Sequence, residues 1–246
     1  RDGDKMGFPV FPMQWKDPQT GDISLGYREW GYLPQAFINM LVMLGWNPGN
    51  IQEIFTIEEL ISEFSIEKVQ KSGAKFDPEK TKWFNHQYIL QAENEELVKY
   101  FHEILIEQNI NAPKQLIIEI SGLIKDRLNL LTEFWEHASY FFIAPTEYDE
   151  ALLKKHITPE TPVWIEKIKA NIKSIDNWQS AIIEEKIKNC IQENSYPMGK
   201  IFNILRLAMV GKNHGIGIAD IIHILGKEET INRIDKLLKY TSNGHI

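Results

Sequence analysis

The sequence predicts a mainly α-helical fold that is preceded by a short mixed segment. From residue 34 onward, apolar residues recur three and four positions apart, which is the period of an amphipathic helix. The first 33 residues instead combine prolines, glycines and aromatic residues, a composition typical of turns and irregular structure. After position 34, no series of alternating apolar and polar residues indicates a set of strands.

Length and composition place the chain among ordinary globular proteins and leave its function open. Of its 246 residues, 43% are hydrophobic and 25% are charged. With 27 Lys and Arg against 34 Asp and Glu, the formal net charge is -7. A net negative charge opposes wholesale wrapping of nucleic acid, although it permits a local basic face.

Three features lead us to expect a cytoplasmic protein with no membrane segment. The longest apolar run, residues 32–46, is shorter than a bilayer-spanning helix and contains Pro34, Gln35 and Asn39. No basic and then apolar leader precedes it, so we expect no secretion. The single cysteine, Cys190, excludes an internal disulfide and a multi-cysteine metal site, as is usual in a reducing compartment.

A turn is predicted near the start of the chain, at residues 17–22. The string Asp-Pro-Gln-Thr-Gly-Asp is rich in residues that favour turns. Apolar residues alternate with others before it, and Ile23 and Leu25 follow it. These features favour a short hairpin or an irregular excursion.

Helices are predicted along the rest of the chain from their start and stop signals. Pro34 suits a first helical turn. Thr56 with Glu59 three residues later forms a capping box, which begins a helix. A looser stretch with three prolines, residues 144–162, divides the later helices into two groups. The predicted helices cover residues 34–45, 57–64, 95–107, 113–124, 126–139, 163–175, 178–193, 198–210, 219–225 and 227–240.

The sequence contains no complete catalytic or metal site, so we expect no catalytic residue and no bound metal in this chain. No two of the seven histidines are four residues apart, and none is beside Cys190. There is no G-x-S-x-G nucleophile motif and no G-x-x-x-x-G-K-[ST] phosphate loop. The acidic residues follow the exposed faces of the predicted helices, where carboxylates are usually solvated.

The most informative polar segment lies between two predicted helices, at residues 211–217. It reads Gly-Lys-Asn-His-Gly-Ile-Gly and follows a helix on which Arg206 lies beside the apolar stripe. Glycines allow the backbone to approach a ligand closely, and the N-terminus of the next helix offers N–H groups to an anion. Arg206, Lys212 and His214 would add side-chain donors. Two interpretations stay open: a loop that contacts phosphates or bases, and an ordinary helix–turn–helix corner.

Lysines and a tryptophan form a second candidate surface. Residues 68–82 are a basic patch in which Lys80 and Lys82 precede Trp83, an aromatic side chain on which a base could stack. A solvated loop and helix end would have the same composition. Three other tryptophans are expected to be core or packing residues: Trp46, Trp135 and Trp164.

Several separated strings of residues carry a family resemblance. They are Tyr32-Leu33-Pro34-Gln35-Ala36 with Asn39 and Leu44-Gly45-Trp46; Phe76-Asp77 with Lys80, Trp83, Asn85, Tyr88 and Ile89; Leu205-Arg206-Leu207-Ala208 with Gly211; and Leu225-Gly226-Lys227-Glu228 with Arg233-Ile234. Each string is weak alone. Together, in this order and at about these spacings, they resemble the motifs of bacterial glutamyl-tRNA synthetases.

The resemblance implies the C-terminal half of such a synthetase. Arg1 would be the last residue of the class I signature K-[LM]-S-K-R, and the nucleotide-binding fold would lie further upstream. Residues 1–92 would contain the end of the signature loop and a stem-contact region. Residues 93–158 and 159–246 would be two all-α anticodon-binding subdomains, which together form a superhelical bundle.

The resemblance also implies the activity of the whole enzyme, a glutamate–tRNA ligase. It would use ATP and Mg²⁺ to form glutamyl-adenylate and would then pass glutamate to the 3′-terminal ribose of its tRNA. The signature loop would stabilise the charge that develops on the phosphates. The present chain would bind no cofactor, would be inactive alone and monomeric, and would hold the tRNA.

The same resemblance implies which side chains touch tRNA. Arg206 matches the arginine of the family's L-R-x-A motif and would contact an anticodon base, with the glycine-rich loop beside it. Arg127 would correspond to an arginine that reads the wobble-side base, and the basic patch would face the inner bend of the tRNA. The expected tRNA-binding residues are therefore Arg206, Arg127, Lys212, His214, Gly215, Ile216, Lys80, Lys82 and Trp83.

A second class of function also fits the composition. A helical protein-interaction scaffold with no nucleic-acid role would share the acidic balance and the lack of a concentrated basic run. Such a scaffold would have no continuous positive stripe joining Lys80, Arg127 and Arg206.

Overall fold

The computed structural model describes residues 7–70, 73 and 76–242, and it is mainly α-helical, as predicted. Arg1, which the family resemblance assigns to a signature loop, lies outside the described residues. The chain forms two compact units, Arg1–Glu136 and His137–Ile246. In the described part of the chain, no helix combines the length and the apolar character that crossing a membrane requires.

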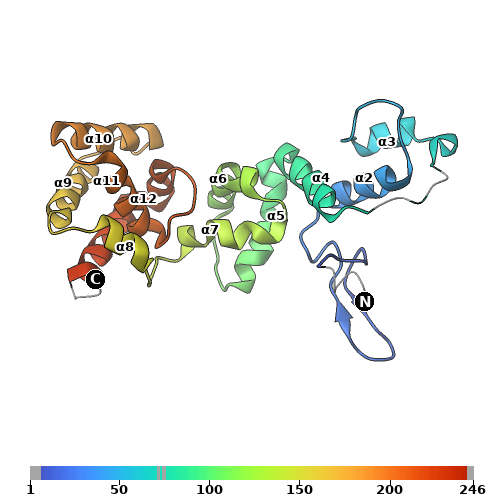
Figure 1. The fold of residues 1–246 in the computed structure, drawn as a ribbon, viewed down its shortest axis with the longest axis horizontal. Helices are drawn as coiled ribbons and strands as arrows, with labels where there is room; N and C mark the ends of the chain where they lie inside the picture. The colour runs from blue at the N-terminus through green and yellow to red at the C-terminus, as the bar shows by residue number, and fades with distance from the viewer. Residues whose placement is uncertain (1–6, 71–72, 74–75, 243–246) are drawn as a thin grey trace. The chain divides into compact units, whose positions relative to one another are not determined.

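The first unit begins with the predicted hairpin (Figure 1). Its two strands are β1, Trp15–Lys16, and β2, Ile23–Ser24. They pair antiparallel, with Trp15 opposite Ser24. The Asp17 N–H donates to the Asp22 carbonyl over 2.8 Å, so the turn between the strands closes on itself.

Two helices of the first unit begin where local signals predict them, and a helix over residues 78–91 was not predicted. Pro34 is the first residue of α2. Thr56 and Glu59 form the predicted capping box of α3, because each side chain accepts from the other's N–H, over 3.2 and 2.7 Å. Asp77 caps α4 by accepting from two N–H groups of its first turn. The helices are α2, Pro34–Gly45; α3, Ile57–Glu63; α4, Pro78–Gln91; α5, Asn94–Glu107; and α6, Lys114–Ile124; with 3-10 turns η1, Ile66–Lys68; η2, Lys125–Arg127; and η3, Leu131–Glu133. Helix α7, Phe134–Phe142, follows η3.

The helix predicted over residues 126–139 is wrong in its first half, where the chain forms two 3-10 turns with a bend between them. Tertiary hydrogen bonds replace helical ones in this segment. The Asn129 carbonyl accepts from the Asn85 side chain over 2.6 Å, and the Leu131 N–H donates to the Gly31 carbonyl over 3.0 Å. These long-range bonds override a helical pattern of apolar residues.

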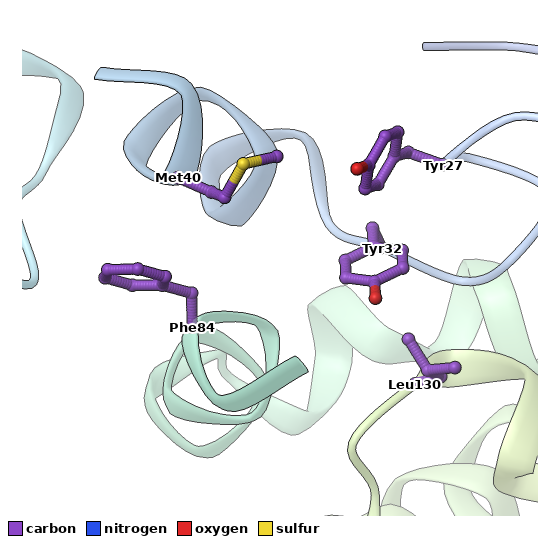
Figure 2. Close-up of a cluster of buried hydrophobic side chains, with 5 residues drawn as sticks. All are labelled: Tyr27, Tyr32, Met40, Phe84 and Leu130. Carbon is purple, nitrogen blue, oxygen red and sulfur yellow. The ribbon is translucent and has the colours of Figure 1, made fainter. Parts of the chain in front are cut away.

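Two clusters of buried side chains contribute to the core of the first unit. Figure 2 shows one of them, to which the segment before α2, helices α2 and α4, and the bend before η3 all contribute. Its members are Tyr27, Tyr32, Met40, Phe84 and Leu130. The second cluster contains Trp46, Phe55 and Leu60, and Trp46 is only 2% exposed, which confirms its expected packing role.

Two buried asparagines connect distant segments of the first unit. The Asn85 side chain bonds with three backbone groups: the Leu33 N–H at 2.8 Å, the Gly31 carbonyl at 3.2 Å and the Asn129 carbonyl at 2.6 Å. The Asn39 side chain donates to the Glu53 carbonyl and accepts from the Phe55 N–H, over 2.8 and 2.9 Å. Both asparagines belong to the strings that carry the family resemblance, and here both hold the backbone in place.

The second unit begins within α7 and continues with further helices, the last of which is broken. They are α8, Glu150–His156; α9, Thr161–Lys173; α10, Ser180–Glu193; α11, Met198–Val210; and α12, Ile218–Ser242 (Figure 1). Helix α8 was not predicted; Asp149 begins it by accepting from the Leu152 N–H over 3.0 Å. The backbone of α12 is non-helical at Gly226, so the two separate helices predicted over 219–225 and 227–240 are confirmed.

Gly211 ends α11 in the left-handed conformation, with φ of 82°. A Cβ atom at this position would lie 2.7 Å from the Glu147 carbonyl oxygen and 2.9 Å from Pro145. The Gly211 carbonyl accepts from the Asp149 N–H over 2.9 Å. Glycine is therefore required here both by the backbone conformation and by the close approach of the 145–149 segment.

We expect Asn85→Ala to lower the free energy of unfolding by about 3 kcal/mol, because the buried Leu33 N–H loses its partner and the carbonyls of Gly31 and Asn129 each lose a hydrogen bond. Urea denaturation followed by circular dichroism measures this loss. Asn50→Ala is the control, since Asn50 is exposed and bonds only locally, with the Gln52 N–H. Equal losses in the two variants would contradict the role assigned to Asn85.

We expect Gly211→Ala to destabilise the protein by about 2 kcal/mol or more, because alanine is strained at this φ and its Cβ meets backbone. Gly199→Ala is the matched control, since a Cβ there has no neighbour within 4 Å and the site is helical. That variant should unfold at an equal or higher temperature than wild type. Thermal melts that rank the two variants in the opposite order would refute this account.

Candidate nucleic-acid interface

The candidate site is the loop of residues 211–217, which joins α11 to α12 in the second unit. Arg206, on the last two turns of α11, ties this loop to its own helix. Its Nη1 donates to the Ile216 carbonyl over 2.8 Å and to the His214 carbonyl over 3.1 Å. As predicted, Arg206 lies off the apolar stripe: it is half-buried, whereas its neighbours Leu205 and Leu207 are buried.

Gly215 brings the loop close to a tyrosine that the sequence did not single out. A Cβ atom at Gly215 would lie 3.2 Å from the Tyr140 hydroxyl and 3.5 Å from Arg206 Nη1. With φ of 105°, this position also favours glycine. The Tyr140 ring meets the His214 ring edge to face, 5.9 Å away. Tyr140 lies at the end of α7, and no local signal in its string Ser-Tyr-Phe-Phe indicates this contact.

The predicted loop residues differ in exposure. Lys212 and His214 are exposed and Gly215 is half-buried. Ile216 is only 6% exposed, so it offers little surface for the expected contact with tRNA. The loop therefore presents a lysine, an imidazole and part of an oriented guanidinium on one short stretch. These groups can donate hydrogen bonds to base edges or phosphates.

The start of α12 is less suited to an anion than the sequence suggested. A Cβ at Gly217 would lie 2.6 Å from a carboxylate oxygen of Asp220, so this carboxylate covers the first turn. Ser180 donates to the other oxygen of the same carboxylate. Because a negative charge already occupies this helix N-terminus, a phosphate would be repelled there. The geometry thus favours base contacts over phosphate contacts at this end of the loop.

A buried arginine joins the end of α7 to the end of α11, from which the loop starts. Arg233, on α12, is 2% exposed and donates through Nη1 to the carbonyls of Tyr140 and Met209, over 2.6 and 2.7 Å. Its Nε donates to Glu229 over 2.7 Å. Burial raises the pKa of the nearby Tyr148 hydroxyl, an effect that the positive charge of Arg233 partly offsets. Arg233 belongs to the last string of the family resemblance, and its role in this structure is to join helices.

The candidate residues of the first unit lie on α4 and at the end of η2. Arg127 is exposed, and the Trp83 side chain is 40% exposed beside the ring of Phe84. Lys80 forms an ion pair with Glu53, and Lys82 forms one with Glu79 over 3.1 Å. These acidic partners reduce the positive potential that the sequence alone suggests.

The expectation that Trp135 and Trp164 are core residues is wrong, because both are half-buried. Trp164 lies at the edge of the second unit, with the Lys200 ammonium 5.4 Å from its ring and the Tyr196 ring 5.6 Å away. An apolar helical position at the boundary of a packed face produces the same sequence pattern as a core position.

No group of three or more His, Cys, Asp or Glu side chains that could hold a metal ion occurs among the residues that the structure describes. Cys190 is a free, buried thiol, and burial raises its pKa.

Two protein families match this chain. Residues 93–238 match the family described as "Anticodon binding domain". Residues 19–83 match part of "tRNA synthetases class I (E and Q), catalytic domain". The first match covers more than half of the chain and includes the whole of the loop at residues 211–217.

Curated relatives that match nearly the whole of this chain are named glutamate–tRNA ligase. Glutamate–tRNA ligase of Porphyromonas gingivalis is 48% identical over 239 residues, which are 97% of this chain and 47% of that protein. The enzyme of Christiangramia forsetii is 46% identical over 236 residues, with 96% and 47% covered. The chain thus spans about half the length of the curated relatives it matches.

Solved structures agree with these matches. A glutamate tRNA ligase from Elizabethkingia meningosepticum, solved with its amino acid, has a TM-score of 0.92 and 43% identity over 97% of this chain and 47% of its own. The glutamate–tRNA synthetase of Elizabethkingia anophelis has a TM-score of 0.89 and 42% identity, with the same coverage. This chain therefore belongs to the anticodon-binding domain family and is homologous to about half of the length of the glutamate–tRNA ligases.

Proposed function

We propose that this chain is the tRNA-binding part of a glutamate–tRNA ligase and that it recognises the stem and the anticodon of its tRNA. The observation that carries the proposal is the oriented Arg206 in a glycine-rich loop, within the segment that matches anticodon-binding domains. The names of the relatives support the same function and give no support to a protein-interaction scaffold.

The whole enzyme would attach glutamate to the 3′ end of tRNA in an ATP-dependent reaction of two steps. The glutamate carboxylate attacks the α-phosphate of ATP, which releases pyrophosphate and leaves glutamyl-adenylate. A hydroxyl of the terminal ribose then displaces AMP. We assign this chemistry, with its Mg²⁺, to the half of the relatives' length that this chain does not span, and we expect the chain alone to be inactive.

Anticodon recognition would depend on a guanidinium that is held before the tRNA arrives. Specific RNA recognition requires unstacked bases whose edges meet fixed donors. Two carbonyls of the loop accept from Nη1 of Arg206, and so they set the plane of the guanidinium. A donor that is already oriented loses less entropy when it binds a base. Lys212 and His214, exposed on the same loop, would contact neighbouring groups of the RNA.

The remaining contacts would come from the first unit. There, the exposed Arg127 would approach the wobble-side base, and Lys80, Lys82 and Trp83 would face the inner bend of the tRNA. We assign residues 1–92 to the end of the signature loop and a stem-contact region, and the start of the anticodon-binding match at residue 93 supports a boundary there. We further propose subdomains at 93–158 and 159–246, a monomeric state and a cytoplasmic location.

We expect Arg206→Lys to weaken binding of the glutamate-accepting tRNA by about 1–3 kcal/mol, because lysine keeps the charge but lacks the planar fork. Binding is measured with labelled tRNA at several salt concentrations, and the salt slope should stay unchanged. A transcript with one changed anticodon base should be affected much less. An equal loss for every tRNA would show that Arg206 does not read a base.

Two lysine variants serve as controls for this measurement. Lys212→Ala, which removes an exposed charge from the loop, should weaken all tRNAs alike and reduce the salt slope by about 1. Lys188→Ala removes a lysine that pairs with Glu184 on α10, and it should have no effect. If the wild-type chain binds no tRNA at low salt while its helices are intact, the proposed function is wrong.

A further inference from the structure

We infer that Tyr140 is a positioning residue for anticodon recognition, because its ring supports the loop of residues 211–217 and thereby sets the guanidinium of Arg206. This inference rests on the proposed function. It concerns a residue outside the loop, one position beyond the helix predicted over residues 126–139, and no motif in the sequence indicates it.

Two residues of the loop, Gly215 and His214, lie against the Tyr140 side chain. At Gly215 an added Cβ would lie 3.2 Å from the Tyr140 hydroxyl and 3.4 Å from the ring carbon that bears it. The same Cβ would lie 3.5 Å from Arg206 Nη1, so the tyrosine and the arginine both border the open side of Gly215. The His214 ring meets the Tyr140 ring edge to face at 86°. The Tyr140 side chain therefore packs against Gly215 and His214. The His214 carbonyl is one of the two that accept from Arg206.

The backbone of Tyr140 is itself held in place by a hydrogen bond from Arg233. Arg233 donates through one nitrogen to the Tyr140 carbonyl and to the Met209 carbonyl, over 2.6 and 2.7 Å. Met209 is the second-last residue of α11, just before the loop. The backbone that carries the tyrosine and the backbone that enters the loop are thus joined to the same guanidinium. With both ends held, the distance between the ring and the loop is determined by the size of the side chain at 140.

A smaller side chain at 140 would leave space below Gly215. The loop would then settle toward α7, and the carbonyls of His214 and Ile216 would move away from their present places beside Arg206. A displaced guanidinium still carries its charge, so attraction to RNA would persist while the hydrogen bonds to a specific base would be lost. Loss of discrimination, rather than loss of overall affinity, is the property that separates positioning from a general packing role.

The test compares Tyr140→Leu and Tyr140→Phe in the full chain, with glutamate-accepting tRNA and a transcript in which one anticodon base is changed. We expect Tyr140→Leu to lose about tenfold in affinity for the first tRNA and little for the second, at an unchanged salt slope. Tyr140→Phe, which keeps the ring, should discriminate like wild type. Ile168→Ala, a truncation of a fully buried residue on α9, is the stability control and should retain discrimination.

A second variant keeps the test decisive if Tyr140→Leu does not fold. Gly215→Ala places a methyl group against the Tyr140 hydroxyl and should reduce discrimination, and adding Tyr140→Phe should restore part of it, because the nearest atom is removed. The inference fails if Tyr140→Leu discriminates like wild type, if Ile168→Ala loses as much, or if the double variant shows no recovery. A wild-type chain that binds no tRNA would instead refute the proposed function.

Discussion

The centre of the second unit is held by one buried charge, the guanidinium of Arg233. The last carbonyls of a helix have no partner within that helix, and buried carbonyls without partners are costly. Tyr140 and Met209 supply such carbonyls at the ends of α7 and α11, and Arg233 satisfies both. Glu229 and the negative ends of the two helices offset its charge, so a cation that is 2% exposed is tolerated. Because Arg233 holds the carbonyl of Met209 near the end of α11, it also fixes the point from which the candidate loop starts.

Some lysines of this chain bind carbonyls at the ends of helices. The number of basic residues in the sequence is therefore a poor guide to the positive charge available for RNA. The Lys227 ammonium donates to the Lys173 carbonyl over 3.2 Å at the end of α9, and Lys125 donates to the Ala92 carbonyl over 3.1 Å just after α4. These cations satisfy helix C-termini. A positive surface must therefore be built from the fewer cations that remain exposed, such as Lys212 on the loop. Local placement, rather than net charge, determines where an acidic protein can meet RNA.

Features with a local signal could be predicted from the sequence, and features that depend on distant contacts could not. The hairpin, the capping box at Thr56 and the break at Gly226 each follow from a few neighbouring residues, and all are present. The bend at 128–130 arises from bonds to Asn85 and Gly31, which lie far away in the chain. The site shows the same division: the family resemblance indicated Arg206, whereas the support from Tyr140 depends on packing between α7 and the loop.

The carboxylate of Asp220 determines which kind of contact the loop favours. It lies over the first turn of α12, held by Ser180, in the place where a phosphate would otherwise bind. Non-specific RNA binding comes almost entirely from phosphate contacts, so in the proposed complex this carboxylate would lower the affinity for every RNA equally. Hydrogen bonds to bases are not reduced in the same way, because they are short-ranged and directional. In the proposed tRNA complex, an acidic group beside the candidate loop would therefore raise the share of the binding energy that depends on the identity of the base.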